Sequence, residues 1–113
     1  MAKVVKLGAP DMEPIKLTSA IARAKIREIA INSSRVAFTD HVLKRMSERD
    51  ITTRHVLNSL RKGSVYDEPI WDLQHSNWKV CVVHRAAGAE IEIVSGLIWP
   101  DGLVVVTAIK RKN

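Results

Sequence analysis

A chain of 113 residues is long enough for one domain with a single core and too short for two. Hydrophobic residues make up 46% of it and charged residues 27%, a globular composition that argues against disorder over most of the length. The net charge is +6, and the excess lies in residues 1 to 62, with thirteen basic and six acidic residues. This favours an anionic partner, either nucleic acid or an acidic protein, although a basic domain without such a partner has the same composition.

Cys81 is the only cysteine, so the chain can form no internal disulfide and no multi-cysteine metal site. It lies in the apolar run "WKVCVVH", where a small buried hydrophobic residue is a commoner role than a nucleophile. The first residues, "MAKVVKLGAPDMEP", lack the apolar stretch of a signal peptide, and no segment has the length of a membrane span. We expect a cytoplasmic protein with no membrane partner.

Residues 1–14 are expected to be a leader outside a single domain of residues 15–113, because Pro10 and Pro14 bracket a polar segment. From Ile15 onward the apolar residues follow helical spacing. These residues are Ala22, Ile26, Ile29 and Ala30. The opposite side is basic, so the first helix should be amphipathic and should end near "NSS".

Two more helices are expected before the pattern changes. Thr39 can cap the second helix, because its hydroxyl accepts from free backbone N–H groups, and this helix should run to about Arg49. Thr52 can cap the third helix, which should end before Gly63, where tolerance of positive φ is expected. Its inward residues would be Val56, Leu57 and Leu60.

After residue 63 the apolar period changes from 3.6 to 2. The segments "NWKVCVVHRA", "AEIEIVSGLIW" and "GLVVVTAIK" predict three strands joined by hairpin turns, and "IWDLQ" could begin another. Ile91, Ile93 and Leu97 alternate with Glu90 and Glu92, as in a sheet with one buried and one wet face. We therefore predict an α+β fold, with N-terminal helices packed on one face of a three- to four-stranded antiparallel sheet.

The second helix carries His41, Arg45 and Arg49 at four-residue spacing, which places all three on one side. On a helical wheel this basic stripe borders the apolar stripe of Val42 and Met46. The three side chains should therefore lie at the edge of the packed core, where a groove could form.

This stripe has the residue types that RNA cleavage requires. Two guanidiniums one turn apart can grip a phosphate, and a histidine beside them can supply or take a proton near neutral pH. Attack by a 2′-hydroxyl needs a base, charge stabilisation and an acid for the leaving oxygen. The alternative is a solvated helix face in which Glu48 and Asp50 pair with the arginines.

The strands carry a second set of candidates. His84 and Arg85 end one strand, and Lys79 shares a face with Arg85, so this pair could bind a nucleic-acid backbone on the open side of the sheet. The end of the chain adds three basic residues that could contact phosphate, Lys110, Arg111 and Lys112. Satisfied surface pairs and an ordinary charged terminus are the alternatives.

Other chemistries lose support from the sequence. It has no glycine-rich phosphate loop, Ser-His-Asp order or dinucleotide fingerprint. His55 and His75 are interpreted as surface residues, and no spacing of histidines and carboxylates indicates a metal site. The three tryptophans could stack bases, but each stands beside a turn or strand end, where it could equally cover the core edge.

The stretch "HVLKRMSERDITTRHVLNSLRKGSVYDE", followed by "IEIVSGLIWPDGLVVVTAIK", resembles a bacterial family of unknown function. Its members show a histidine, an arginine in "RM.ER.I", a second helix ending in glycine and a C-terminal "vvTv" strand. This family is usually grouped with the RelE-like toxins, including the BrnT and MqsR types, which are small basic ribonucleases or translation inhibitors of toxin-antitoxin systems. The resemblance covers about residues 38 to 110.

The resemblance implies a RelE-like fold, cleavage of RNA without a metal or other cofactor, and neutralisation by a cognate antitoxin protein. RNA, including ribosome-bound mRNA, is the implied substrate. By position, His41, Arg45 and Arg49 match the family's motif on the second helix. Active residues of RelE-like enzymes lie mainly on the sheet and C-terminus, where the candidates by type are Lys79, His84, Arg85 and Lys110.

Our leading hypothesis is a toxin-type, metal-independent endoribonuclease. Its candidate catalytic residues are His41, Arg45, Arg49 and His84, and its candidate RNA-binding residues are Lys79, Arg85, Lys110, Arg111 and Lys112. The alternative is a non-catalytic module of the same fold that binds RNA or an acidic protein.

Overall fold

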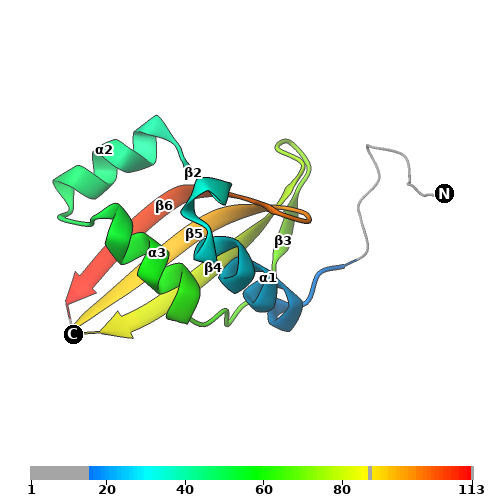
Figure 1. Ribbon diagram of the computed structural model, residues 1–113, viewed down its shortest axis with the longest axis horizontal. Coiled ribbons are helices and arrows are strands. Elements are labelled where there is room, and N and C mark those ends of the chain that lie inside the picture. The colour runs from blue at the N-terminus through cyan, green and yellow to red at the C-terminus, as the bar shows by residue number, and fades with distance from the viewer. Residues whose placement is uncertain (1–15, 87, 113) are drawn as a thin grey trace.

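The computed structural model describes residues 16–86 and 88–112 (Figure 1). The expected leader, residues 1–14, lies outside the described residues. Over the described ranges the elements are α1 (Ser19–Ile31), the 3₁₀ helix η1 (Ser33–Arg35), β2 (Val36–Phe38), α2 (Asp40–Glu48), α3 (Thr53–Lys62), β3 (Ile70–Asp72), β4 (Asn77–Ala86), β5 (Ala89–Ile98) and β6 (Gly102–Lys112). None of the helices among them is both long and apolar enough to cross a membrane.

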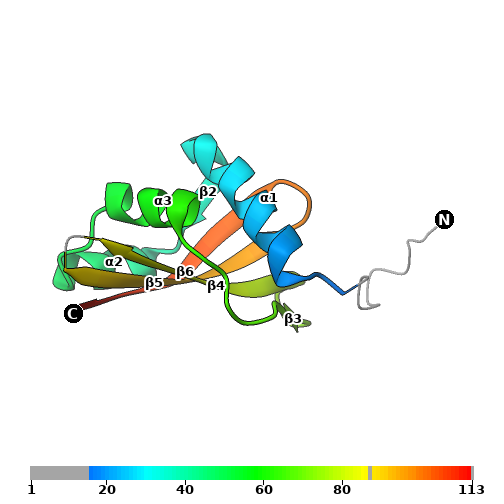
Figure 2. The ribbon, with the colours of Figure 1, turned by 90° about the horizontal axis from the view of Figure 1, so that it is seen from below.

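The strands form one sheet in the order β2-β6-β5-β4-β3. All neighbouring pairs are antiparallel except β2 and β6, which run parallel. Helices α1 and α3 cover one face of this sheet, as Figure 2 shows, and α2 lies beside β6. The predicted α+β fold with helices on one face is confirmed, and the sheet has five strands among the described residues instead of three or four.

Threonine hydroxyls begin all three α-helices in the described part of the chain. The Thr39 Oγ1 accepts from the Val42 N–H at 3.0 Å, and the Thr52 Oγ1 accepts from the His55 N–H at 3.1 Å, as predicted. Thr18 caps α1 in the same way. Helix α2 ends at Glu48, within a residue of the expected end.

Gly63 ends α3 for a different reason than expected. Its φ is −74°, which any residue can adopt, so positive φ is not what selects glycine there. A Cβ at this position would lie 2.6 Å from the Ser59 carbonyl oxygen and 2.6 Å from the Val82 Cγ1. Glycine therefore lets the end of α3 approach β4 closely.

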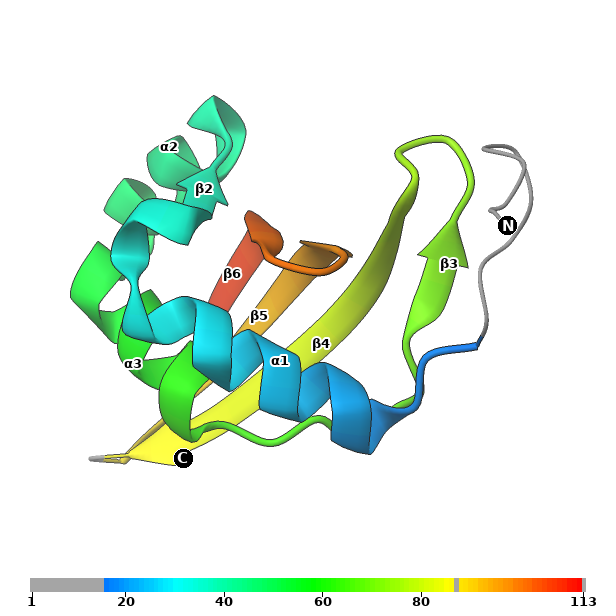
Figure 3. The same ribbon diagram turned by 45° about the vertical axis from the view of Figure 1, so that its right-hand side comes forward.

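Strand β2 was not predicted. It has only three residues, and its partners are Leu103 to Val105 at the other end of the chain. A segment of three residues shows too little alternation to indicate a strand, and pairing at this sequence separation leaves no local pattern. Figure 3 shows β2 and β3 at opposite edges of the sheet, with α1 crossing in front of the strands.

The core lies between α1, α2 and α3 and the sheet. The four residues predicted for α1 are all buried, as are Val42 and Met46 of α2. The strands contribute the buried side chains Trp78, Val80, Val82, Ile93, Leu97, Leu103, Val105 and Ala108. The periodicity of the sequence therefore identified the correct faces of α1 and α2.

The other face of the sheet, which we call the open face, is less polar than expected. Glu90 and Glu92 point to it, as the alternation predicted. Arg85 and Val83 lie directly opposite them on β4, and the side chains of directly paired residues point to the same face of a sheet. Aliphatic side chains share this face, namely Val83, Val94, Val104 and Ile109. They are only half-buried, and no described element covers them (Figure 2).

The tryptophans mainly cover the edge of the core. Trp78 is buried, and Trp71 packs against it edge to face, with ring centroids 5.3 Å apart. Trp99 is 51% exposed, and the Lys25 ammonium lies 5.1 Å from its ring centroid. Only Trp99 therefore presents a largely free ring.

Candidate active site

The structure assigns separate partners to the two arginines of the stripe on α2. The Arg45 guanidinium pairs with Glu48 at 3.0 Å in an exposed ion pair, as the solvated-face alternative anticipated. The Arg49 Nη1 donates to the Ala108 carbonyl oxygen of β6 at 2.8 Å. His41 is exposed on the same helix. The stripe therefore does not converge on one phosphate-sized position.

The contact of Arg49 explains why α2 lies along β6. Strand β2 pairs with β6 only as far as Val105, so among the residues that the structure describes the later carbonyl groups on that edge have no strand partner. The Thr39 N–H donates to the Val105 carbonyl oxygen at 3.4 Å, and the Arg49 side chain donates to the Ala108 carbonyl oxygen further along β6. Arg49 thus holds the end of α2 against the sheet.

The cations predicted on the open face are present there but are paired. The Lys79 Nζ lies 2.9 Å from the Asp72 Oδ2, and the Arg85 Nε donates to the Glu90 Oε1 at 2.8 Å. Arg111 forms ion pairs with Glu90 and with Glu92. Lys112 is exposed at the end of β6.

These pairs change the acid–base properties of their carboxylates. Hydrogen bonds from Lys79 and His75 hold the pKa of Asp72 well below its usual range. A hydrogen bond from Arg111 lowers the pKa of Glu92 in the same way. Both carboxylates therefore stay charged near neutral pH and continue to offset the cations beside them.

Two other predicted residues, His84 and Lys110, come together on the helix-covered face. Ile91 of β5 pairs with His84 on β4 and with Lys110 on β6, so the three residues form a row across the sheet. The outer strands of such a row lie about 10 Å apart. A phosphodiester with its flanking sugars is large enough to reach from one side chain to the other.

A β-bulge is what turns Lys110 toward the helices. Val105 is buried under them, and simple alternation from it would place Lys110 on the open face. The register of β5 and β6 shifts between Val94 and Ser95, so that Ala108 is buried and Lys110 follows it on the same side. Arg111 is correspondingly turned to the open face, where it meets its carboxylates.

Helix α3 completes the site as a pocket of about 210 Å³ above this row. Gly63 allows α3 to pack close to β4, and the helix lies over the end of the sheet where β4 turns into β5 (Figure 1). The lining residues are His55, Asn58, Ser59, His84, Ala89, Ile91 and Lys110. Two imidazoles and an ammonium therefore face one cavity, and none of the described residues that line it is a carboxylate, an arrangement suited to an anion.

The ring of His55 is held by the cap of α3. Its Nδ1 accepts a hydrogen bond from the Thr52 backbone N–H at 3.1 Å, while the backbone N–H of His55 donates to the Thr52 hydroxyl. A backbone N–H can only donate, so Nδ1 carries no proton and the neutral ring has its proton on Nε2. His55 can therefore act as a hydrogen-bond donor through Nε2.

Lys110 is held at the rim of the pocket by weaker contacts. Its Nζ donates to the Asp50 carbonyl oxygen at 3.4 Å and lies 4.0 Å from the Asp50 carboxylate, which is 97% exposed. An ion pair at that distance and exposure offsets little of the ammonium's charge. Lys110 thus remains able to attract a phosphate.

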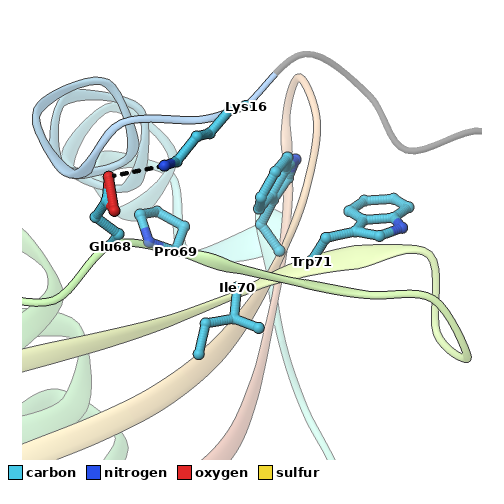
Figure 4. A pocket seen from close by; sticks show the side chains of 6 residues that line it. Lys16, Glu68, Pro69, Ile70 and Trp71 are labelled. Atoms are coloured by element: carbon cyan, nitrogen blue, oxygen red, sulfur yellow. Dashed lines mark ion pairs between the residues drawn. The ribbon is translucent and has the colours of Figure 1, made fainter.

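A second cavity, of about 470 Å³, lies beside β3 at the other end of the sheet (Figure 4). Lys16 and Glu68 form an ion pair of 3.3 Å at its rim, and Trp71 and Trp78 line it. Within the described ranges the indole Nε1 of Trp71 is buried without an acceptor. None of the predicted catalytic or RNA-binding residues lines this cavity, so we assign no chemistry to it.

Cys81, for which the role of a small buried hydrophobic residue was expected, lies on the open face and is half-buried. Burial, reinforced by the neighbouring Glu92 carboxylate, raises the pKa of the Cys81 thiol to about 11. The thiol is therefore protonated at neutral pH, which agrees with the interpretation that it is not a nucleophile. In the described part of the chain no cluster of three or more potential ligands could hold a metal ion.

This geometry defines the class of protein. It is a small α+β domain with a basic pocket between a capped helix and the end of a sheet. The chain belongs to the family described as Domain of unknown function (DUF4258), whose model matches residues 38–110, from the end of β2 to β6. Comparisons with curated proteins and with solved structures found no match. The resemblance to RelE-like toxins has no named relative behind it and stays a prediction.

Sequence reasoning missed His55 as a site residue. It was interpreted as a surface histidine, and it is indeed exposed, yet its ring lines the pocket. Its position three residues after a capping threonine was a usable signal, because that spacing fixes where the ring lies. The companions of His55 in the pocket depend on the packing of α3 and on the bulge in β6, which no local pattern reveals.

Proposed function

We propose that this protein is a metal-independent endoribonuclease of the toxin type, with its chemistry in the α3 pocket. The observation that carries this proposal is the shared pocket of His55, His84 and Lys110. Two imidazoles and an ammonium can move protons and balance phosphate charge without a metal ion. The basic helical half of the chain would attract the polyanionic substrate.

The proposed reaction is attack of a ribose 2′-hydroxyl on the neighbouring phosphodiester. His84 takes the 2′-hydroxyl proton as the 2′-oxygen bonds to phosphorus, and the bond from phosphorus to the 5′-oxygen breaks. The Lys110 ammonium gives a proton to the leaving 5′-oxygen, while the His55 Nε2–H donates to a non-bridging oxygen. The products are a 2′,3′-cyclic phosphate and a free 5′-hydroxyl.

The toxin role rests on the resemblance noted in the sequence. That resemblance implies an mRNA substrate and a cognate antitoxin that would neutralise the enzyme by binding it. The charge of +6 is consistent with both RNA and an acidic protein partner. The toxin role is tested separately from the chemistry, by growth arrest on expression and its relief by the product of an adjacent gene.

The chemistry is tested with purified protein, labelled RNA and EDTA. His84→Ala and Lys110→Ala should each lower the cleavage rate by roughly 10²- to 10⁴-fold, the range for loss of an acid–base group. His75→Ala is the matched control, because His75 lies in the β3–β4 turn, away from the pocket, and should leave the rate unchanged. Circular dichroism and thermal melting establish that each variant is folded.

The same assay separates this site from the predicted stripe on α2. Loss of cleavage in His41→Ala together with full activity in His84→Ala would place the chemistry on α2. RNA that stays intact at high enzyme concentration would contradict cleavage altogether. Salt-dependent RNA binding without any product would identify the alternative function, a non-catalytic RNA-binding module.

A further inference from the structure

The open face of the sheet has a charge distribution unlike that of the whole chain. The strands place three cations on it, Lys79, Arg85 and Arg111. They also place three carboxylates on it, Asp72, Glu90 and Glu92. These six charges cancel and are paired within the chain, whereas the protein as a whole carries +6. A nucleic acid would find no net positive field on this face.

The rest of the open face is apolar and only partly shielded. Val94 lies in the middle of it, between Cys81 on β4 and Thr107 on β6. Val83, Val104 and Ile109 surround this centre and are half-buried. Ile98, at the end of β5, is 49% exposed. No described element covers these side chains, although α1 and α3 cover the opposite face (Figure 2).

We infer that the open face binds a second copy of this chain, forming a dimer in which two sheets pack face to face. A neutral face meets no net repulsion from an identical face, whereas the basic surface elsewhere would repel its own copy. Apolar side chains from two such faces interdigitate in the way that sheets pack in sandwich folds. The charges are already paired within each chain, so burial leaves few of them without a partner.

The size of the face sets the expected affinity. Strands β4, β5 and β6 are 10, 10 and 11 residues long. Together they span about 34 Å along the strands and about 14 Å across them, by standard strand dimensions. Two such faces together amount to about 950 Å², which is below the size of a stable interface and within the range of weak, transient ones, so the dimer should dissociate in the micromolar range.

The test is the oligomeric state of the full-length protein, measured by sedimentation across the micromolar range. The wild type should form a dimer, and Val94→Glu should raise its dissociation constant at least about 100-fold, because the new carboxylate would be buried without a partner. Ile31→Glu introduces the same charge at a residue of α1 that is 75% exposed, and it should leave the dimer unchanged. Both variants are first shown to be folded by circular dichroism.

A second variant keeps the test decisive if Val94→Glu fails to fold. Ile98→Glu changes a more exposed residue at the end of the same face, and it should also weaken the dimer. A protein that stays monomeric throughout the micromolar range overturns the inference. So does a dimer that persists in both open-face variants. Loss of RNA binding in a variant whose sedimentation matches that of the wild type would assign the face to nucleic acid and would likewise overturn it.

Discussion

At the level of single residues, hydrogen-bond partners determine what each histidine can do. The His55 Nδ1 faces the Thr52 N–H, which can only donate, whereas the His75 Nδ1 lies 2.7 Å from the Asp72 carboxylate, which accepts. The Nδ1 of His75 must therefore carry a proton, whereas the Nδ1 of His55 carries none. His55 presents an N–H at Nε2 toward the pocket because of the cap of α3.

This contrast predicts opposite nitrogen-15 signals from two histidines of one protein. The His55 Nδ1 should give the signal of an unprotonated nitrogen, and the His75 Nδ1 that of a protonated one, because each follows its hydrogen-bond partner. Nuclear magnetic resonance of imidazole-labelled protein at neutral pH measures both, with His55→Gln and His75→Gln variants to assign the signals. A protonated Nδ1 at His55 in the folded protein would refute the assigned donor role. The spectrum is independent of any RNA cleavage.

Residue types alone identified part of the pocket. His84 and Lys110 were candidates because an imidazole and an ammonium are suited to phosphate chemistry. Which side of the sheet Lys110 faces could not be predicted, since the answer depends on one bulged residue opposite β5. For the stripe on α2, the sequence predicted the position of the side chains but not their contacts. Its spacing predicted a position at the border of the core, and of its three residues Arg49 contacts the edge of the sheet, at the Ala108 carbonyl oxygen.

At the level of secondary-structure elements, α2 and β6 depend on each other. Strand β2 is too short to pair with the whole edge of β6, and α2 covers the remainder through the Thr39 N–H and the Arg49 side chain. An uncovered edge would expose backbone groups that can pair with another chain. Arg49 is therefore a structural residue of α2, whatever contacts His41 and Arg45 make.

Two matched substitutions on α2 should differ in their effect on stability. Arg49→Met removes a charged hydrogen bond to the Ala108 carbonyl and should lower the free energy of unfolding by about 1–2 kcal/mol. Arg45→Met removes only an exposed ion pair with Glu48 and should cost at most about 0.5 kcal/mol. Urea unfolding followed by circular dichroism measures both. Equal effects of the two substitutions would show that the Arg49 contact contributes little to the docking of α2.

The elements that the sequence predicted are those with a local signal. The three helices have threonine caps and apolar periodicity, and the three long strands have alternation and hairpin turns. Strand β2 was missed because its three residues pair with a segment more than sixty residues away. The prediction of a wet face was only partly correct, since Val94 and Val104 share that face with the two glutamates.

For the whole molecule, the distribution of charge separates the two faces of the sheet. On the open face the cations of the strands are offset by carboxylates, while the helical half of the chain holds the positive excess. Long-range attraction of an anionic chain should therefore lead it to the side where α3 and the pocket lie. The dimer inferred above uses the opposite face and would leave this side free.

Arginine substitutions on the two faces should therefore affect RNA binding differently. Arg54→Gln, one residue before His55 on α3, should weaken binding and reduce the salt slope by about 0.7, the value for one phosphate contact of a single strand. Arg85→Gln removes the same charge from the open face, where Glu90 already pairs with it, and should change neither quantity. Binding of 2′-O-methyl RNA, which cannot be cleaved, is titrated at several salt concentrations for both variants. Because both proteins carry the same net charge, a difference between them reports the position of the lost cation. An equal loss from Arg85→Gln would instead support the sequence-based prediction that the open-face cations contact RNA.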